Sequence, residues 1–333
     1  MTVRVSVIIV TYNSSHVIEG CLRPLAIDDD IEIIVVDNAS SDSSVDLVRE
    51  TAPSATIITN DQNVGFARAV NQAARLATSE CLCLLNPDAR TTPADLCDLS
   101  NLAVSRNAIV GPRVIHPESR LKIQSAGKLP LTWRMFTHYS GLSRIPGNLD
   151  VLQGHYLLLR QHQSDQYNVE YVAGACMVVP TSLYRALDGL TERWFMYAED
   201  IEFCYRAMRT GHEIILQNST AIEHAIGSSD SSVRRRVNTA WVVNLYDFYD
   251  RDLCKTTSQF YAWGLVVSAG LLTRSLAYLA NSLRKKDSSG AWRSESRKFM
   301  IYAASVLKRM VEGRARPRDD RNENPLRKHE AGR

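Results

Sequence analysis

The chain has 333 residues, of which 45% are hydrophobic and 23% are charged, and its formal net charge is +3. These values are ordinary for a globular protein with one large domain and an appendage, or with two domains. No uninterrupted apolar run reaches the length of a transmembrane helix, and the N-terminus lacks a signal-peptide layout, so we expect a cytoplasmic protein.

The seven cysteines are an odd number and show no C-x-x-C spacing. Cys81, Cys83, Cys176 and Cys204 lie in apolar surroundings. This pattern predicts buried, reduced thiols and argues against both a disulfide framework and a zinc site.

The charge is divided unevenly along the chain. Residues 284–333 contain 15 Lys and Arg against 7 Asp and Glu, a net charge of +8, whereas the rest contains 24 against 29, a net charge of −5. A mildly acidic body therefore carries a basic tail. Nucleic-acid binding is a poor explanation of this tail, because no recognised nucleic-acid module accompanies the basic residues.

Four strand–helix units are predicted up to residue 88. The strands are short apolar runs, typical of strands buried on both faces, and they cover residues 3–10, 31–36, 55–58 and 81–85. Helices are expected up to about Leu25, from about Ser43, and through residues 66–74. Alternating strands and helices imply right-handed crossovers and a mostly parallel, Rossmann-like α/β sheet. The G-x-G-x-x-G and G-K-[ST] patterns are absent, which argues against a nicotinamide dehydrogenase and a P-loop ATPase.

The fourth strand breaks off into Asn86-Pro87-Asp88. Pro87 cannot continue a central ladder, so the strand ends there and Asp88 lies at the carboxyl edge of the sheet, where open α/β sheets bind ligands. A carboxylate at this place suits Mg²⁺ or Mn²⁺ bridging to substrate phosphates. The alternative is a turn or helix-capping aspartate.

The second half of the chain is less regular. The apolar run ends at residues 108–111, and residues 116–166 show no clear periodicity. A long irregular insertion in a compact domain is either functional or mobile, and we expect acceptor contacts here. Further strands are expected at residues 170–179, followed by a short helix opened by Pro180, and at residues 213–217.

An aromatic loop turns into a helix at Glu199 and Asp200. Helix N-termini favour carboxylates, so capping is one explanation. Three acids within four residues, Glu202 included, beside Trp194 and Tyr197 are more than a cap needs. His224 ends an apolar segment before a Gly-Ser turn, and we expect it to face a cleft.

These segments together resemble inverting glycosyltransferases of family 2 with the GT-A fold, and in particular the rhamnosyltransferase-like bacterial members. The matching segments run in the family's order and cover residues 7–13, 34–42, 63–71, 85–88, 195–202 and 224–229. The chain departs from the family where Asn86 replaces a common acid, Glu223 a common histidine, and Glu202 a common aspartate.

The resemblance implies a metal-dependent transfer of a sugar, with rhamnose as a candidate, from a dTDP- or UDP-sugar to a hydroxyl of a glycan or polyprenyl-linked acceptor in cell-surface polysaccharide synthesis. It makes Asp200 the general base, with Glu199 orienting Asp200 or the acceptor, and makes Asp88 and His224 the ligands of Mg²⁺ or Mn²⁺. Acceptor contacts would come from Trp194, Tyr197 and Glu202. The implied donor-binding residues are Thr11, Tyr12, Asn13, Asp37, Asn38, Asn63, Gly65, Phe66, Arg68, Asn71, Asn86, Asp88 and Arg90.

We expect a catalytic domain over residues 1–250, with a donor half to about residue 112 and an acceptor half after it. A helical extension follows over residues 251–312 and a disordered basic tail over residues 313–333. The extension holds a helix at residues 260–283 and a second amphipathic stretch that begins near Trp292. One interpretation is a helical hairpin packed on the catalytic body or another subunit. The other is a pair of in-plane helices bound to anionic lipid, which would place the protein on the inner face of the cell membrane.

Two other functions stay open at this point. A sugar-1-phosphate nucleotidyltransferase needs a glycine-rich, basic loop after the first strand, and residues 11–15 lack it. A non-catalytic nucleotide-sugar-binding subunit would have no need to keep Asp88, Asp200 and His224 together.

Overall fold

The computed structural model describes residues 5–145, 149–158, 164–225, 237–284 and 289–314. Its contacts divide the chain into two compact units, Met1–Trp241 and Val242–Arg333. The division therefore falls after Trp241, whereas the sequence analysis placed it after residue 250. The two units are described one after the other.

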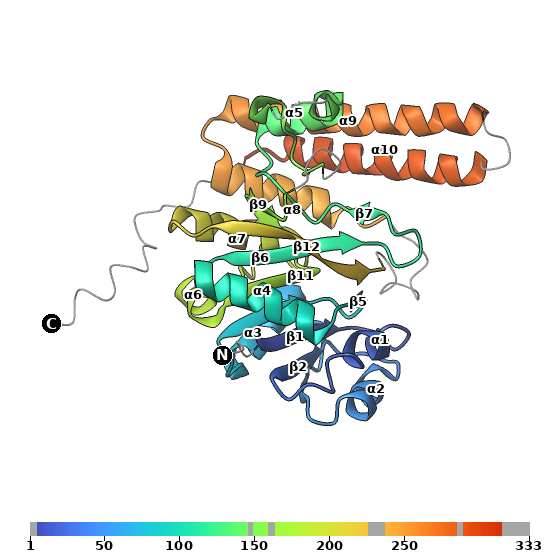
Figure 1. Cartoon of the computed structure of the whole chain (residues 1–333). Helices are drawn as coiled ribbons and strands as arrows, with labels where there is room; N and C mark the ends of the chain where they lie inside the picture. Colours follow the sequence, from blue (N-terminus) through green and yellow to red (C-terminus); the bar gives the residue numbers. More distant parts are fainter. Residues whose placement is uncertain (1–4, 146–148, 159–163, 226–236, 285–288, 315–333) are drawn as a thin grey trace. The chain divides into compact units, whose positions relative to one another are not determined.

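The first half of unit 1 is the predicted parallel sheet, in the order β3-β2-β1-β4 (Figure 1). Its strands are β1 (Val5–Thr11), β2 (Ile31–Asp37), β3 (Thr56–Thr59) and β4 (Cys81–Leu85). The helices between them are α1 (Ile18–Leu22), α2 (Ser44–Thr51) and α3 (Phe66–Leu76). The expected strand–helix alternation is confirmed, although α1 ends earlier than Leu25.

The second half extends the same sheet in the order β11-β6-β12-β5. β11 runs antiparallel to β4 and β6, and β12 runs parallel to β6. The carboxyl ends of β1, β2, β4, β6 and β12 therefore meet at one edge. The strands here are β5 (Ala89–Arg90), β6 (Ile109–Ile115), β7 (Lys122–Ile123), β9 (Gln166–Val169), β11 (Cys176–Pro180) and β12 (Ile214–His224). The helices are α4 (Pro93–Arg106), α6 (Thr181–Ala186) and α7 (Glu199–Arg209).

The prediction of one strand over residues 170–179 is wrong. β10 (Tyr171–Val172) pairs with β8 (Ala126–Gly127) in a separate two-stranded sheet, and β11 starts only at Cys176. The amide of Ala173 still donates to the Ser125 carbonyl, in the register of β10 and β8, whereas the amide of Gly174 donates to the Asp200 carboxylate, so the chain leaves that ladder at residue 174. The insertion expected at residues 116–166 does hold regular elements, namely α5 (Thr132–Ser140), η1 (Leu142–Arg144) and η2 (Asp150–Leu152).

Two apolar cores lie on the two faces of the sheet. The first includes residues of α3 and α7, among them Ala69 and Phe203, and the second includes residues of α1, α2 and α4, among them Leu22 and Leu96. The sheet is therefore the middle layer of three, which is why its strands are mostly apolar and β4 is apolar on every residue. All seven cysteines are free thiols; five are buried, whereas Cys97 and Cys254 are partly exposed.

Unit 2 is helical. Its elements are α8 (Ala240–Phe248), a π-helical turn at Tyr249–Leu253, α9 (Thr257–Arg284) and α10 (Ser289–Val311). α9 and α10 form an antiparallel hairpin (Figure 1), and α8 closes it with an aromatic stack in which Trp263 lies 4.5 Å from Tyr246. The side chain of Asp250 is fully buried and binds Arg309 at 2.9 Å and Arg314 at 3.0 Å, which ties the end of α10 to the π-helical turn.

The outer face of α9 stays apolar. Its exposed large side chains fall on one stripe of the helix, and they are Tyr261, Leu265, Leu272, Leu276, Leu279 and Leu283. The serines at 268, 275 and 282 lie buried on another face, where the Ser275 hydroxyl donates to the Ser296 carbonyl of α10 at 2.8 Å. By length and composition alone, α9 is long and apolar enough to cross a membrane. The core helices of soluble proteins meet the same two criteria. Ser268, Ser275 and Ser282 interrupt the apolar run of α9, but they do not exclude it as a membrane-spanning helix.

Candidate active site

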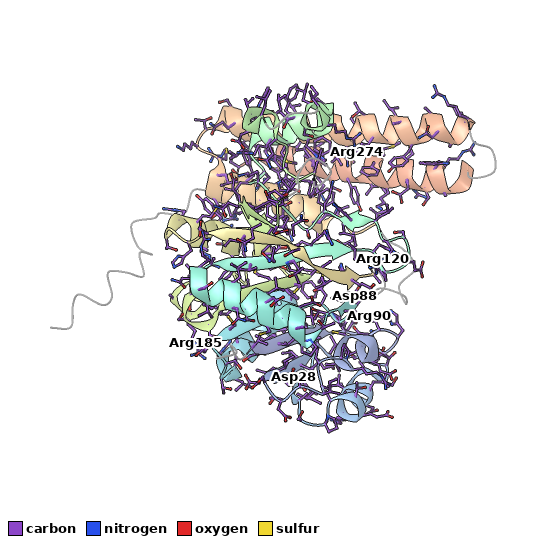
Figure 2. All side chains as sticks on the ribbon, viewed as in Figure 1. Asp28, Asp88, Arg90, Arg120, Arg185 and Arg274 are labelled. Carbon is purple, nitrogen blue, oxygen red and sulfur yellow. The ribbon has the colours of Figure 1, made fainter. Side chains whose placement is uncertain are left out.

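Asp88, His224 and Asn86 converge at the carboxyl edge of the sheet. β5 pairs with the end of β12, so that His224 lies opposite Ala89. Figure 2 labels Asp88 and Arg90, which flank Ala89. The His224 Nε2 atom lies 3.0 Å from Asp88 Oδ1 and 3.3 Å from Asn86 Nδ2. Both partners of the ion pair are largely buried.

The donor set at this point fits a hard divalent cation. A carboxylate, an imidazole and an amide oxygen can supply part of an octahedral shell, and Mg²⁺ and Mn²⁺ commonly complete theirs with water and substrate phosphates. Within the described residues no group of three or more His, Cys, Asp or Glu side chains could hold a metal ion, so a ligand would have to complete the shell. Gly227 and Ser229 of the expected ligand turn lie outside the described residues.

The loops after β1 and β2, here called the donor edge (residues 11–13 and 37–41), hold each other in place. The Asn13 side chain accepts from the Ser41 amide at 2.8 Å, and the Asn13 amide donates to Ser40 Oγ at 2.8 Å. Asp37 accepts from the Ser40 amide at 2.9 Å. Because the polar groups on these loops satisfy one another, the edge is preorganised, and the half-exposed ring of Tyr12 projects beside it. The buried Thr11 hydroxyl has no hydrogen-bond partner among the described residues.

The start of α3 is joined to both sides of the site. The Asn38 side chain donates to the Gly65 carbonyl at 3.3 Å, and the Asn63 side chain accepts from the Gly65 amide at 3.1 Å. The Phe66 amide donates to the Phe195 carbonyl at 2.9 Å. Gly65 has a φ of 89°, and a Cβ there would lie 2.5 Å from the Phe195 oxygen, so no other residue fits without strain.

Three predicted donor residues have other partners. Arg68 binds Glu192 at 3.0 Å. Asn71 uses both ends of its amide, donating to the Leu190 carbonyl at 2.9 Å and accepting from the Leu190 amide at 3.0 Å, and so holds the turn before the aromatic loop. Arg90 is exposed, and its guanidinium packs over Gly20 of α1.

The aromatic loop (residues 194–198) carries backbone strain. Tyr197 and Ala198 have φ angles of 73° and 77°, in the left-handed region that residues with a side chain rarely adopt. These two residues turn the chain directly into α7, whose first residues are Glu199 and Asp200. The loop exposes Phe195, Met196 and Tyr197, and Trp194 stacks under the Arg193 guanidinium at 4.7 Å.

Glu199 and Asp200 are adjacent carboxyls in unlike surroundings. Asp200 accepts from the Gly174 amide at 3.0 Å and from the Ile201 amide at 2.8 Å. Glu199 is 5% exposed, and its Oε2 is buried without a hydrogen-bond partner among the described residues. Burial, with the charge of Asp200 as a second cause, raises the pKa of Glu199 to about 8, and burial also raises the pKa of Asp200. Since the anion of Asp200 is stabilised by more backbone amides than that of Glu199, Glu199 holds the proton near neutral pH and Asp200 the charge.

Glu202, in the same turn of α7, is held by an arginine. It is buried and bound by Arg206 at 2.8 Å and 3.0 Å, and Arg206 also donates to the Gly189 carbonyl at 2.7 Å. These contacts tie α7 to the preceding turn and occupy Glu202, which was expected among the acceptor contacts.

Gly174 is a site residue that the sequence analysis missed. The peptide segment 174–175 links the two groups of acids, because the Asn86 amide donates to the Ala175 carbonyl at 3.0 Å while the Gly174 amide binds Asp200. A glycine inside an apolar run indicates a bulge or a close backbone approach, and that signal was present.

Residues 6–167 match the family described as "Glycosyl transferase family 2". The chain is 30% identical over 211 residues to the low-salt glycan biosynthesis hexosyltransferase Agl10 of Haloferax volcanii. This match covers 61% of this chain and 61% of that protein. It is 23% identical over 241 residues to the N-acetylglucosaminyl-diphospho-decaprenol L-rhamnosyltransferase of Mycobacterium tuberculosis, covering 67% of this chain and 76% of that one. The chain thus spans about three-fifths of the first relative's length.

Among solved structures, the mannosyltransferase PcManGT of Pyrobaculum calidifontis, in complex with GDP-Man and Mn²⁺, superposes with a TM-score of 0.54. The two chains are 18% identical, and the match covers 94% of this chain and 87% of that one. The likeness establishes the GT-A fold, as the resemblance implied.

Proposed function

Because residues 6–167 form a glycosyl transferase family 2 domain, we propose that the protein is an inverting glycosyltransferase. It moves one sugar from a nucleoside-diphosphate sugar to a hydroxyl of a glycan or lipid-linked acceptor in the synthesis of a cell-surface polysaccharide. One observation carries this proposal: the peptide segment 174–175 connects the region of Asp88 with Asp200. The Ala175 carbonyl accepts from the Asn86 amide, and the Gly174 amide donates to Asp200. Asp88 is buried at the carboxyl edge of the sheet, and Asp200 lies half-buried in the first turn of α7.

The chain's own residues divide the work between them. Asp200 takes the proton of the acceptor hydroxyl as its oxygen bonds to the anomeric carbon, and the bond from that carbon to the diphosphate oxygen breaks on the opposite face. A single displacement of this kind inverts the anomeric configuration. Glu199 keeps its proton and leaves the charge on Asp200, and the fixed loop after β2 holds the base and ribose of the donor.

Asp88, His224 and Asn86 would hold Mg²⁺ or Mn²⁺. When bound, the cation neutralises the charge that develops on the leaving diphosphate. The donor is a dTDP- or UDP-sugar, and rhamnose is the candidate sugar, since one relative is named for rhamnosyl transfer. Arg90, exposed beside Asp88 in sequence, adds positive charge near the same group.

We also place the protein on the cytoplasmic face of the cell membrane. The exposed apolar stripe of α9 and the basic balance of residues 284–333 support this location, because amphipathic helices with basic residues bind anionic lipid surfaces. A membrane location suits a lipid-linked acceptor. Self-association through the same stripe is the alternative.

A panel of nucleotide sugars tests the function. We expect one nucleotide sugar to raise the melting temperature with Mg²⁺ or Mn²⁺ present, since a ligand that binds the native state stabilises it. The same compound should be hydrolysed slowly alone and transferred when an acceptor is added. Stabilisation by nucleoside triphosphates instead would favour a nucleotidyltransferase, and binding without any turnover would favour a non-catalytic subunit.

A further inference from the structure

Arg113 is a partly buried arginine that has no partner among the residues that the structure describes. Its Nε atom is fully buried, and the side chain makes no hydrogen bond or ion pair to any residue that the structure describes. Other arginines of the same unit are paired, such as Arg106 with Glu213 at 2.7 Å and Arg68 with Glu192 at 3.0 Å. Burying part of a guanidinium costs free energy unless a hydrogen-bond partner replaces water, so the unpartnered Nε atom calls for an explanation.

The position of Arg113 in β6 assigns it to one face and one edge of the sheet. Side chains alternate along a strand, and Gly111, two residues earlier, packs against Val172, whereas Val110 and Val114 belong to the core on the other face. Arg113 therefore lies on the face that α7 covers. It is also close to the carboxyl end of β6, opposite Ala221 of β12.

Arg113 and Asp200 reach the same level of this face. The Val172 side chain packs on Gly111 of β6, and the Val172 backbone amide donates to the thiol of Cys204 on α7. One step of two residues along β6 towards the edge leads to Arg113, and one turn along α7 towards its start leads to Asp200. Gly174 lies at the same level, because a Cβ atom added to it would lie 3.7 Å from the Cβ atom of Asp200.

The donor edge lies on the other side of the metal-ligand group. The sheet order places β4, which carries Asp88, between β1 and β11, so the loops after β1 and β2 are on one side and β6 is two strands away on the other. Strands lie about 4.8 Å apart, so β6 is roughly 10 Å from β4. A guanidinium here is on the acceptor side of the proposed base.

We propose that Arg113 forms a subsite for a phosphate group of the acceptor, so that the acceptor is a sugar carried on a diphosphate. This inference rests on the proposed function and names its acceptor class. A guanidinium presents a planar set of donors that matches phosphate oxygens, and such charge-assisted bonds are about twice as strong as neutral ones. The acceptor diphosphate supplies the partner that the buried Nε lacks.

The test compares Arg113→Gln and Arg113→Lys with Arg106→Gln, a matched surface control. The full-length proteins are assayed with one sugar presented on a short-chain isoprenyl diphosphate and on an uncharged alkyl glycoside. We expect kcat/KM for the diphosphate acceptor to fall about 10- to 100-fold in Arg113→Gln. Transfer to the alkyl glycoside, donor hydrolysis and donor affinity should stay within about twofold, and Arg106→Gln should match wild type. Arg113→Lys should restore part of the loss.

A binding measurement keeps the inference independent of turnover. With UDP or dTDP and Mg²⁺ at saturation, farnesyl diphosphate should raise the melting temperature of wild type and of Arg106→Gln but not of Arg113→Gln. Equal stabilisation of Arg113→Gln, or an equal loss of transfer to both acceptors, overturns the assignment. A loss of nucleotide affinity in Arg113→Gln would place the residue in the donor site instead. Failure of wild type to transfer any sugar, with farnesyl diphosphate still bound through Arg113, would instead count against the proposed function.

Discussion

The donor edge and the aromatic loop belong to the same proposed site, but their carboxylates differ in how they are hydrogen-bonded. In the donor edge, Asn13 and Asp37 have their hydrogen bonds supplied by neighbouring serines. In the aromatic loop, Tyr197 and Ala198 hold strained φ angles, and Glu199 keeps a buried oxygen without a partner among the described residues. The donor edge is strained too, since Asn13 and Ala39 have φ angles of 52° and 63°, and its Thr11 hydroxyl is also buried without a partner among the described residues. The two regions differ in their carboxylates, because that of Asp37 is hydrogen-bonded by Ser40 whereas one oxygen of Glu199 is not.

The strongest way to break this comparison is Asp200→Asn. An amide cannot take the acceptor's proton, so we expect turnover to fall about 10²- to 10⁴-fold while donor affinity stays near wild type. Steady-state transfer and donor titration measure the two quantities. Asp46→Asn on α2, which changes an exposed carboxyl, is the control. Near-normal turnover across pH would move the general base to another residue, with Glu199 the first candidate.

Asp88→Ala should separate donor binding from the fold. We expect metal-dependent affinity for the nucleoside diphosphate to fall at least about 10-fold, because His224 and Asn86 alone leave the cation without a carboxylate. Titration with and without Mn²⁺, beside a circular dichroism spectrum, checks both points. An unchanged effect of Mn²⁺ would remove Asp88 from the metal site.

Glu199→Gln sharpens the contrast between the two adjacent carboxyls. Since burial raises the pKa of Glu199 in the folded protein to about 8 from its ordinary value of 4.5, the native state holds the extra proton between these values. Stability should therefore be full below about pH 4.5 and should fall as pH rises towards 8, by at most about 1.4 kcal/mol per pH unit. The glutamine variant lacks this proton, so its denaturant midpoints should fall less over the same range. If the denaturant midpoints of both proteins fall equally as pH rises, Glu199 is not the group responsible.

The smallest expected effect concerns unit 2, outside this comparison, and tests whether the α9 stripe contacts lipid. Leu272→Glu and Leu276→Glu should each weaken flotation with anionic liposomes about 10-fold, since burying one leucine is worth about 1.5–3 kcal/mol. Thr273→Glu lies at the same depth of the helix but off the stripe, and should float like wild type. If the leucine variants float normally while a dimer dissociates, the stripe is a protein interface.

The sequence predicted the parts of the fold that are local in origin. The four apolar runs up to Leu85 follow from strand burial, and all four are confirmed as strands. The end of the fourth strand before Asp88 follows from the geometry of Pro87, and it is confirmed too. The break between β10 and β11 was missed, because it depends on Ser125 and Asp200, which are distant in the sequence and bind the peptides at 173–174. Composition alone carries no record of such partners.

The site shows the same limit. Asn71 and Glu202 match a motif by position, yet their partners are Leu190 and Arg206, which only the folded chain brings into reach. Asp88 and His224 were expected to share a cation, and the pairing of β5 with β12 places them 3.0 Å apart. A motif thus identified the residue types, while long-range pairing decided which of them face one another.

The distribution of thiols gives the protein a built-in pair of reporters. Five cysteines are buried, and the two that reach solvent are divided between the units, with Cys97 on α4 and Cys254 just before α9. A gentle thiol reagent would therefore attach one spin label or dye to each unit of the natural sequence, with Cys254 slower because burial raises the pKa of its thiol. The distance between the two labels, followed as donor or lipid is added, would report any movement of the helical hairpin without a single substitution.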